Sequence, residues 1–214
     1  MDILFSLGKG FLLGGSICLL GFLVDTHFCK ESQRNMQEQQ LELYNKGVET
    51  VQTNIMIIGP MFYTLVDQTL LTHSYEIQFL NILSMLAIHS IGYYGVHYYM
   101  HKIPVLYSIH KFHHSFDRFL LPSIGNAVSF EEFFLAYMGP FIFGAYVLRP
   151  NEISFVIPIG IIGILNLVIH CKELEDVPWN KYFVSPKNHI EHHEKRTGHY
   201  AAPTVNLDYV FQGY

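Results

Sequence analysis

Three short runs of the sequence concentrate histidine: residues 97–101 (HYYMH), 110–114 (HKFHH) and 189–193 (HIEHH). These histidine boxes hold eight of the thirteen histidines in the chain. Neither packing nor solubility calls for such an arrangement, whereas imidazole nitrogen is a common ligand of zinc, copper, iron and nickel. The boxes therefore predict a metal site built from histidine side chains.

The spacing within each box places its histidines on one face of a helix. His97 and His101 are four residues apart, one turn above the other. Pro104 is expected to end their helix and to begin the next, on which the whole second box would lie. For the third box, Ser185-Pro186 is typical of a helix start and Thr197-Gly198 of a helix stop. We therefore expect three helices, each with an imidazole face.

The number of ligands indicates more than one metal ion. A catalytic zinc needs three protein ligands and an open position, so eight imidazoles exceed the need of one zinc but suit two ions with open positions. There is no HExxH motif of a zinc protease, and Cys18, Cys29 and Cys171 are scattered without a CxxC. His170, at the end of an apolar stretch, is a ninth candidate. The predicted ligands are His97, His101, His110, His113, His114, His170, His189, His192 and His193.

Each histidine ligand also needs a partner for its outer ring nitrogen. The candidates are Asp117, Glu131, Glu132, His199 and Asp208, with Glu173, Glu191 and Glu194 also weighed. For Glu191 and Glu194 a solvated helix face is an equal alternative. His199 could itself be a ligand, and so could His89, two helical turns before His97 but deeper in its apolar stretch. His27 and His73 are interpreted as ordinary surface residues.

The composition indicates a membrane protein. Half of the residues are hydrophobic and 14% are charged, against about a quarter charged in an average soluble domain. The net charge of −5, without a basic run, excludes a basic nucleic-acid binder. A membrane span needs about 20 apolar residues. The stretches 3–24, 51–72 and 77–100 meet this length, whereas 133–148 and 153–169 are short and are expected to form a hairpin.

The charged residues predict the orientation of these stretches. Asp2 and Lys9 favour an anchor over a cleaved signal for the first stretch, and Asp67 is expected near a helix end. If every stretch crosses, or enters and returns, then the polar 25–50 segment, the 101–132 loop and the 170–214 tail share one side. That side holds eleven of the thirteen Lys and Arg residues and all three boxes. The positive-inside rule makes it cytoplasmic.

The ordered set of boxes resembles the fatty acid hydroxylase/sterol desaturase superfamily of membrane di-iron enzymes. The family pattern is HxxxH, HxxHH, a membrane hairpin, one more histidine and HxxHH, and it is matched here over roughly residues 85–214. The run Ile109-His-Lys-Phe-His-His is similar to the second box of methylsterol oxidases and sterol hydroxylases. His170 followed by Pro178-Trp179, and the closing Asp208-Tyr-Val-Phe211-Gln-Gly213, also resemble family segments.

The resemblance implies an all-α integral membrane protein with a four-helix transmembrane base, or five apolar stretches including a short hairpin, under a cytoplasmic histidine-box cap. Residues 1–76 would form anchor helices and a polar cytoplasmic loop, and residues 77–214 the catalytic domain. Two ferrous ions would use O2 to hydroxylate or desaturate a C–H bond of a membrane lipid, sterol-like or long-chain acyl. Electrons would come from NAD(P)H through a separate reductase or b-type cytochrome. In a eukaryotic cell the endoplasmic reticulum membrane is expected.

Several positions depart from the family pattern. Tyr98 follows His97 where arginine is usual, His89 and Ser90 stand where acidic residues are usual, and Val128-Ser-Phe-Glu131-Glu132 lacks a usual histidine. Two alternatives stay open: a membrane zinc hydrolase acting on a lipid amide or ester, and a metal-binding pseudoenzyme of the same fold. A metal transporter fits less well, because the histidines gather at one face of the membrane instead of along the spans.

Overall fold

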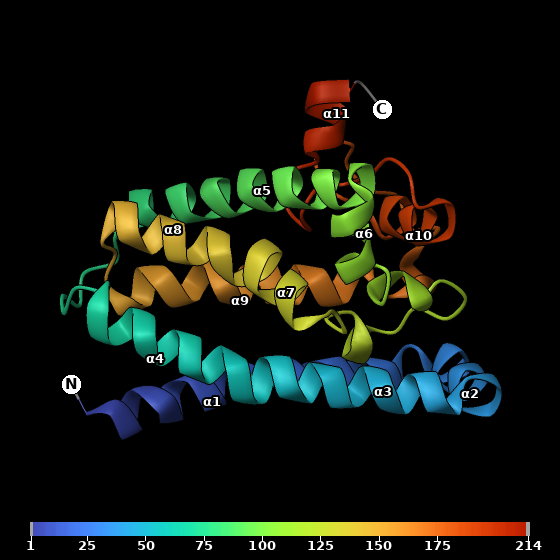
Figure 1. Cartoon of the computed structure of the whole chain (residues 1–214), viewed down its shortest axis with the longest axis horizontal. Coiled ribbons are helices and arrows are strands. Elements are labelled where there is room, and N and C mark those ends of the chain that lie inside the picture. Colours follow the sequence, from blue (N-terminus) through green and yellow to red (C-terminus); the bar gives the residue numbers. More distant parts are fainter. Residues whose placement is uncertain (1, 213–214) are drawn as a thin grey trace.

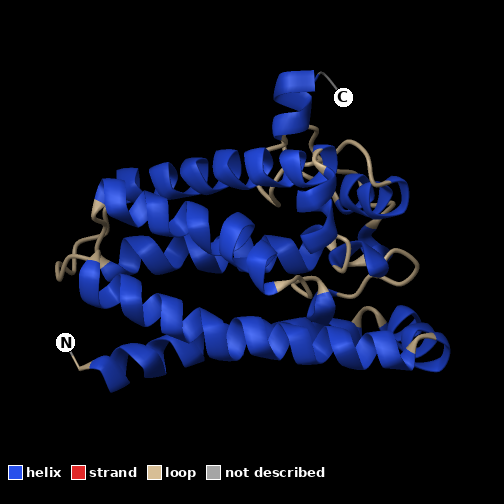
Figure 2. Cartoon of the chain, in the orientation of Figure 1, coloured by secondary structure: helices blue, strands red, loops and turns tan. Residues whose placement is uncertain are grey.

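Helices make up the regular structure of the part of the chain that the computed structural model describes, residues 2–212 (Figure 2). Two isolated β-bridges, Thr72 with Asn151 and Phe183 with Val205, are the exceptions there. The all-α prediction is therefore confirmed. The helices are α1 (Ile3–His27), α2 (Lys30–Gln39), α3 (Leu41–Val51), η1 (Gln52–Ile58), α4 (Gly59–Thr69), α5 (Phe79–Lys102), α6 (Pro104–His110), η2 (His113–Ser115), η3 (Pro122–Ile124), α7 (Phe130–Glu132), η4 (Phe133–Met138), α8 (Gly139–Leu148), α9 (Glu152–Ile169), η5 (Lys172–Leu174), α10 (Pro186–Lys195) and α11 (Leu207–Gln212).

The long helices lie side by side as an elongated bundle (Figure 1). Helix α1 packs along α4, and α5 packs against α8 and α9, while α1 also contacts α9. The segments that carry the histidine boxes gather at the end of the bundle where α5 and α9 finish (Figure 1). We call this end, with α6, η2 and α10, the cap.

Among the described residues, three helices are long and apolar enough to cross a membrane: α1, α5 and α9. The fifth stretch, 153–169, was predicted to be too short for a full crossing, but it forms α9, so this prediction was wrong. The Asn151 side chain accepts a hydrogen bond from the Ser154 backbone N–H at 2.9 Å and so caps a helix of 18 residues. The second stretch is not among these three helices, because a π-helical turn divides it.

Two π-helical turns share one cause. The η1 turn ends at Gly59-Pro60 and the η4 turn ends at Gly139-Pro140. Proline has no N–H and its ring clashes with the carbonyl one turn before it. The N–H of each preceding glycine bonds five residues back, to Asn54 and to Phe134, so the chain widens and both helices continue past proline.

An ion network around the buried Asp67 lies at the bundle end opposite the cap. The Nζ atom of Lys9 is 3.4 Å from a carboxylate oxygen of Asp67 and 2.6 Å from a carboxylate oxygen of Glu152. The Ser6 hydroxyl donates to Asp67 at 2.5 Å. Asp67 lies two residues before the end of α4, as predicted, and is buried among these partners. The network joins α1, α4 and α9.

The predicted helix boundaries in the cap are partly confirmed. Pro104 begins α6, and the Ser185 hydroxyl accepts from the Asn188 N–H at 3.1 Å at the start of α10. Helix α10 ends at Lys195, before the predicted Thr197-Gly198, because Arg196 takes a left-handed conformation. The expectation that one helix carries the second box was wrong: α6 ends at His110 and the box continues in the 3-10 turn η2.

Candidate metal centre

The nine predicted ligands meet in the cap as two adjacent clusters. The five-histidine cluster contains His97, His101, His110, His114 and His192, and the four-histidine cluster contains His113, His170, His189 and His193. Within each cluster one ring nitrogen per residue lies within 4.8 Å of all the others. The clusters adjoin, because the ring centroids of His114 and His193 are 5.0 Å apart.

Each HxxHH box supplies both clusters, a division that its sequence does not reveal. His110 and His114 join the five-histidine cluster while His113, between them, joins the other. In the third box His192 faces the first cluster, whereas His189 and His193, one turn apart, face the second. The two clusters are therefore interlocked through shared backbone segments.

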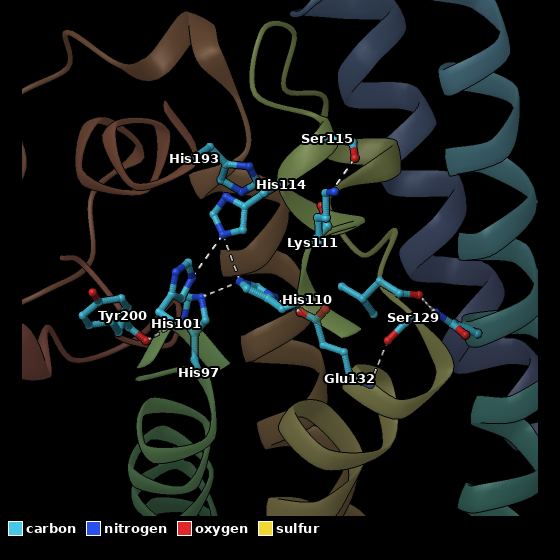
Figure 3. Close-up of polar contacts among 12 residues, drawn as sticks. His97, His101, His110, Lys111, His114, Ser115, Ser129, Glu132, His193 and Tyr200 are labelled. Atoms are coloured by element: carbon cyan, nitrogen blue, oxygen red, sulfur yellow. Dashed lines mark hydrogen bonds and ion pairs between the residues drawn. The ribbon is translucent and has the colours of Figure 1, made fainter. Parts of the chain in front are cut away.

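The inner nitrogens of the five-histidine cluster lie at ligand spacing. Nε2 of His110 is 3.1 Å from Nε2 of His97 and 2.9 Å from that of His114, which is 3.2 Å from that of His101. Two nitrogens that lie about 2.1 Å from one ion at right angles are roughly 3.0 Å apart. Figure 3 shows these four rings pointing toward one another from α5 and from the α6–η2 segment.

The outer nitrogens of His97, His110 and His192 are held by the surrounding chain. Nδ1 of His97 donates to the Tyr200 carbonyl at 2.9 Å, and Nδ1 of His192 donates to the Gly198 carbonyl at 2.6 Å. Nδ1 of His110 donates to a Glu132 carboxylate oxygen at 2.8 Å (Figure 3). A neutral imidazole that donates from Nδ1 carries a lone pair on Nε2. These partners thus fix the tautomer that binds metal.

The facing lone pairs provide a test of whether a metal ion fits. His97 and His110 both donate from Nδ1, so their Nε2 atoms confront each other at 3.1 Å with no proton to share. Both rings are buried, which strengthens their electrostatic repulsion. A cation between the nitrogens would turn this repulsion into attraction, and the donor set therefore fits a metal ion.

In the four-histidine cluster, His170 is held from its outer side in the same way. Nδ1 of His170 donates to the Asn166 carbonyl at 2.7 Å, and its Nε2 lies 3.0 Å from Nε2 of His189. Nε2 of His189 lies 3.2 Å from that of His193. The ring of His113 stacks edge-on against that of His193, with centroids 4.5 Å apart. This cluster offers four nitrogens to a second ion.

A strained loop after α10 supplies two of the carbonyls. Arg196, Gly198 and His199 have φ values of 59°, 68° and 54°, in the left-handed region that non-glycine residues rarely adopt. These turns direct the Gly198 and Tyr200 carbonyls at His192 and His97. The buried Asp208 carboxylate accepts from the Ala201 N–H at 2.8 Å and so holds the loop. This strained backbone orients the rings of His97 and His192 through the two carbonyls.

Of the predicted partners for outer ring nitrogens, Glu132 contacts a ligand ring directly. Asp208 holds the backbone beside the rings instead, and Asp117 pairs with Arg196 at 3.0 Å. Ser129 caps the start of α7 by accepting from the Glu132 N–H. On this helix Glu132 faces inward, and the neighbouring Glu131 is exposed. His199 lies outside both clusters, with Nε2 3.8 Å from a Glu191 oxygen.

The remaining candidates have other surroundings. Glu194 is exposed and Glu191 pairs with Lys195, as expected for a solvated helix face. Glu173 accepts from Ser32 at 2.9 Å. His27 and His73 are exposed, as interpreted from the sequence.

Burial sets the charge of the cap histidines. The seven candidate ligands outside α5, which lie in α6, η2 and α10 and at His170, are all buried. Desolvation lowers the pKa of His170 to about 4 and that of His114 to about 2. Desolvation and the neighbouring imidazoles also hold the pKa of His113, His189, His192 and His193 well below the usual range. These rings are therefore neutral and ready to bind a cation at pH 7.

Two features of the site had no clear signal in the sequence. Gly125 packs against His170 so closely that a Cβ atom there would lie 2.7 Å from the ring. Cys29 and Cys171, far apart in the chain, bring their Sγ atoms within 3.2 Å, and Glu173 lies beside them. Both contacts depend on tertiary packing around His170 and could not be derived from local spacing.

Comparison with known proteins identifies the class of protein. The family model of fatty acid hydroxylases matches residues 82–213, which include all nine histidines of the two clusters. The chain therefore belongs to the fatty acid hydroxylase family, as the order of its boxes predicted. No curated protein and no solved structure matches the chain.

Proposed function

We propose that the protein is a membrane-bound non-haem di-iron oxygenase that hydroxylates or desaturates an unactivated C–H bond of a lipid, sterol-like or long-chain acyl. The observation that carries the proposal is the pair of adjacent clusters, each with inner nitrogens at ligand spacing. Two bound irons would supply the activation of O2. Hydroxylation then balances as R–H plus O2, two electrons and two protons, giving R–OH and water.

The chain's own residues have distinct tasks in this reaction. The five-histidine cluster would hold one iron and the four-histidine cluster the other. Glu132 and the carbonyls of Gly198, Tyr200 and Asn166 keep protons on the outer ring nitrogens. Burial of the rings excludes bulk water, so that the activated oxygen would react with the lipid C–H bond.

Electron supply and orientation belong to the same proposal. A separate reductase or b-type cytochrome would pass electrons from NAD(P)H to the cap. Basic residues on α2, α3 and the cap favour a cytoplasmic position for this end, in the endoplasmic reticulum membrane of a eukaryotic cell. A membrane-impermeant amine reagent applied to sealed vesicles tests the orientation: Lys187 and Lys195 should react only from the cytoplasmic side.

Metal analysis after gentle detergent purification is the decisive experiment. The wild type should hold about two irons per chain, one for each cluster. His192→Ala and His113→Ala should each lose about one, since they remove ligands from different clusters, and the double variant should lose both. His73→Ala, at an exposed residue, is the control and should keep both irons.

Product analysis completes the test. With isotopically labelled O2, NAD(P)H, a reductase and a b-type cytochrome, a hydroxylated lipid should carry one labelled oxygen atom. One zinc per chain with turnover in the absence of O2 would support the lipid hydrolase instead. Full iron loading without product from sterols or acyl lipids would make the protein a metal-binding pseudoenzyme.

A further inference from the structure

An apolar pocket lies inside the bundle, on the membrane side of the metal centre. Its cavity volume is about 120 Å³, and it is partly open to the outside. Along α9 the lining runs from Phe155 to Asn166, eleven steps along the helix or roughly 16 Å at 1.5 Å per residue. Helices α1, η1, α4, α5, η4, α8 and α9 and the loop residue Asn126 line it.

Both π-helical turns border this pocket. Ile55 belongs to η1, while Phe133 and Tyr137 belong to η4. Single π-turns are often found at functional sites, because they widen a helix and redirect its side chains. Here two of them, on separate helices, contribute to one wall.

His89 is the polar group in the lining that has no hydrogen-bond partner within the described part of the protein. Its side chain is 1% exposed, and neither ring nitrogen has a hydrogen-bond partner. The other polar lining groups are paired: Asn166 donates to Asn126 at 2.9 Å, and Tyr63 donates to Glu152 at 2.5 Å. A buried polar group without a partner is costly. A ligand hydroxyl could satisfy His89, because it both donates and accepts.

The charges near the pocket favour a neutral ligand. Tyr63 leads to the network of Lys9, Asp67 and Glu152, in which one ammonium meets two carboxylates. No Lys or Arg lines the pocket among the described residues. A buried carboxylate or phosphate would therefore lack a cation to pair with, which is strongly unfavourable.

The inner wall of the pocket is one layer from the metal centre. Asn166 lines the pocket, and its carbonyl accepts from Nδ1 of the ligand His170. Tyr93 packs between the pocket residue His89 and the ligand His97, with ring centroids 6.0 Å and 5.2 Å away. His89 and His97 are eight residues apart on α5, roughly 12 Å along its axis.

We infer that this pocket binds a neutral lipid with one hydroxyl group, which His89 holds by hydrogen bonds while the hydrocarbon fills the apolar space toward Asn126 and Asn166. Its use as the substrate site rests on the proposed oxygenase function, whereas binding itself does not. A sterol and a long-chain alcohol share the required chemistry. His89 is then a specificity-determining residue outside the metal clusters.

Photo-crosslinking of the purified holoprotein tests the inference with two probes, a diazirine sterol with a free hydroxyl and a diazirine long-chain alcohol. Labelled peptides of the wild type should map to α5 or α9. His89→Leu should cut the yield by about two- to tenfold, the worth of one net hydrogen bond. His89→Gln, which keeps a donor and an acceptor, should recover most of it.

A matched pair of bulky substitutions locates the ligand. Ile159→Trp fills the pocket and should abolish labelling. Ile161→Trp, two residues along the same helix, replaces an exposed side chain that does not line the pocket and should label like the wild type. All variants should keep wild-type iron content, which serves as the check on folding. The probe that labels better identifies the lipid source.

Each failure has a separate meaning. Equal labelling of His89→Leu overturns the hydroxyl contact, and equal labelling of Ile159→Trp overturns the pocket as the binding site. If binding follows the expected pattern but product formation is unchanged in Ile159→Trp, the pocket is not the substrate site. If binding follows the pattern and the wild type makes no product with O2, the oxygenase proposal fails while the lipid site stands.

Discussion

At the scale of the residue, four of the nine cluster histidines are held by a hydrogen bond on the side away from the cluster. Four ligand rings donate from Nδ1, three to backbone carbonyls and one to a carboxylate. The carboxylate, Glu132, is the one of these partners that a substitution can remove without altering the backbone. It also adds negative charge behind His110, which raises the basicity of its Nε2.

Glu132→Ala should therefore weaken metal binding by the five-histidine cluster. Loss of a hydrogen-bonded partner behind a histidine ligand typically costs about 10- to 100-fold in metal affinity. Competition with a graded series of chelators measures this loss. Glu131→Ala is the matched control, because the neighbouring side chain is exposed. Equal retention of metal by the two variants would show that Glu132 is not a support of the site.

Gly125 tests how tightly the four-histidine cluster is packed. An added Cβ would lie 2.7 Å from Cγ and 2.8 Å from Nδ1 of His170, so the ring must move. Gly125→Ala should lower the stability by about 1–3 kcal/mol, as overpacking does, and speed the loss of one metal ion to chelator. Gly95→Ala is the control, since nothing lies within 4 Å of the added atom. Unfolding temperature and metal loss identical to the control would contradict the packing.

At the scale of the element, the helices are joined at both ends of the bundle. The cap joins α5, α6, α9 and α10 through their histidines. At the far end, Lys9 of α1 joins Asp67 of α4 and Glu152 of α9. Lys9 thereby fixes the amino-terminal helix to the part of the chain that matches the family.

Lys9→Met should destabilise the bundle, because it leaves the buried Asp67 carboxylate without its cation. Removing one partner of a buried ion pair costs about 3–5 kcal/mol. Thermal unfolding in detergent measures the change, and Lys30→Met, at an exposed position, is the control. Adding Asp67→Asn should restore part of the loss, since it removes the uncompensated charge. A double variant no more stable than Lys9→Met would argue against the pair.

At the scale of the whole molecule, the sequence predicted what depends on periodicity and order. The spacing of the boxes identified eight of the nine histidines that cluster in the cap, His170 followed from the end of an apolar stretch, and the apolar stretches indicated the long helices. Turns and packing decide three features that the sequence did not predict. The helix carrying the second box ends at His110, each HxxHH box contributes to both clusters, and Glu132 instead of Glu131 faces inward. The pocket around His89 requires helices that are distant in sequence, so no local pattern reveals it.

The clustered neutral histidines also predict how the metal-free protein responds to acid. Folding holds the pKa of six cap histidines below the usual value, His170 at about 4 and His114 at about 2 among them. An unfolded histidine has a pKa of about 6.5. Below that pH the unfolded chain binds more protons than the folded chain, so stability falls as the pH falls.

Each such histidine contributes a loss of about 1.4 kcal/mol per pH unit between its unfolded and folded pKa. The metal-free protein should therefore unfold at progressively lower temperature from about pH 6.5 downward. Bound metal should move the onset of this loss to lower pH, because a ligand nitrogen that holds a cation cannot accept a proton. Thermal unfolding from pH 8 to pH 5, with and without iron, measures both effects. His27→Gln, at an exposed residue, is the control and should leave the acid slope unchanged. An unfolding temperature that stays constant across this range in the metal-free protein would show that the clusters are not buried and neutral.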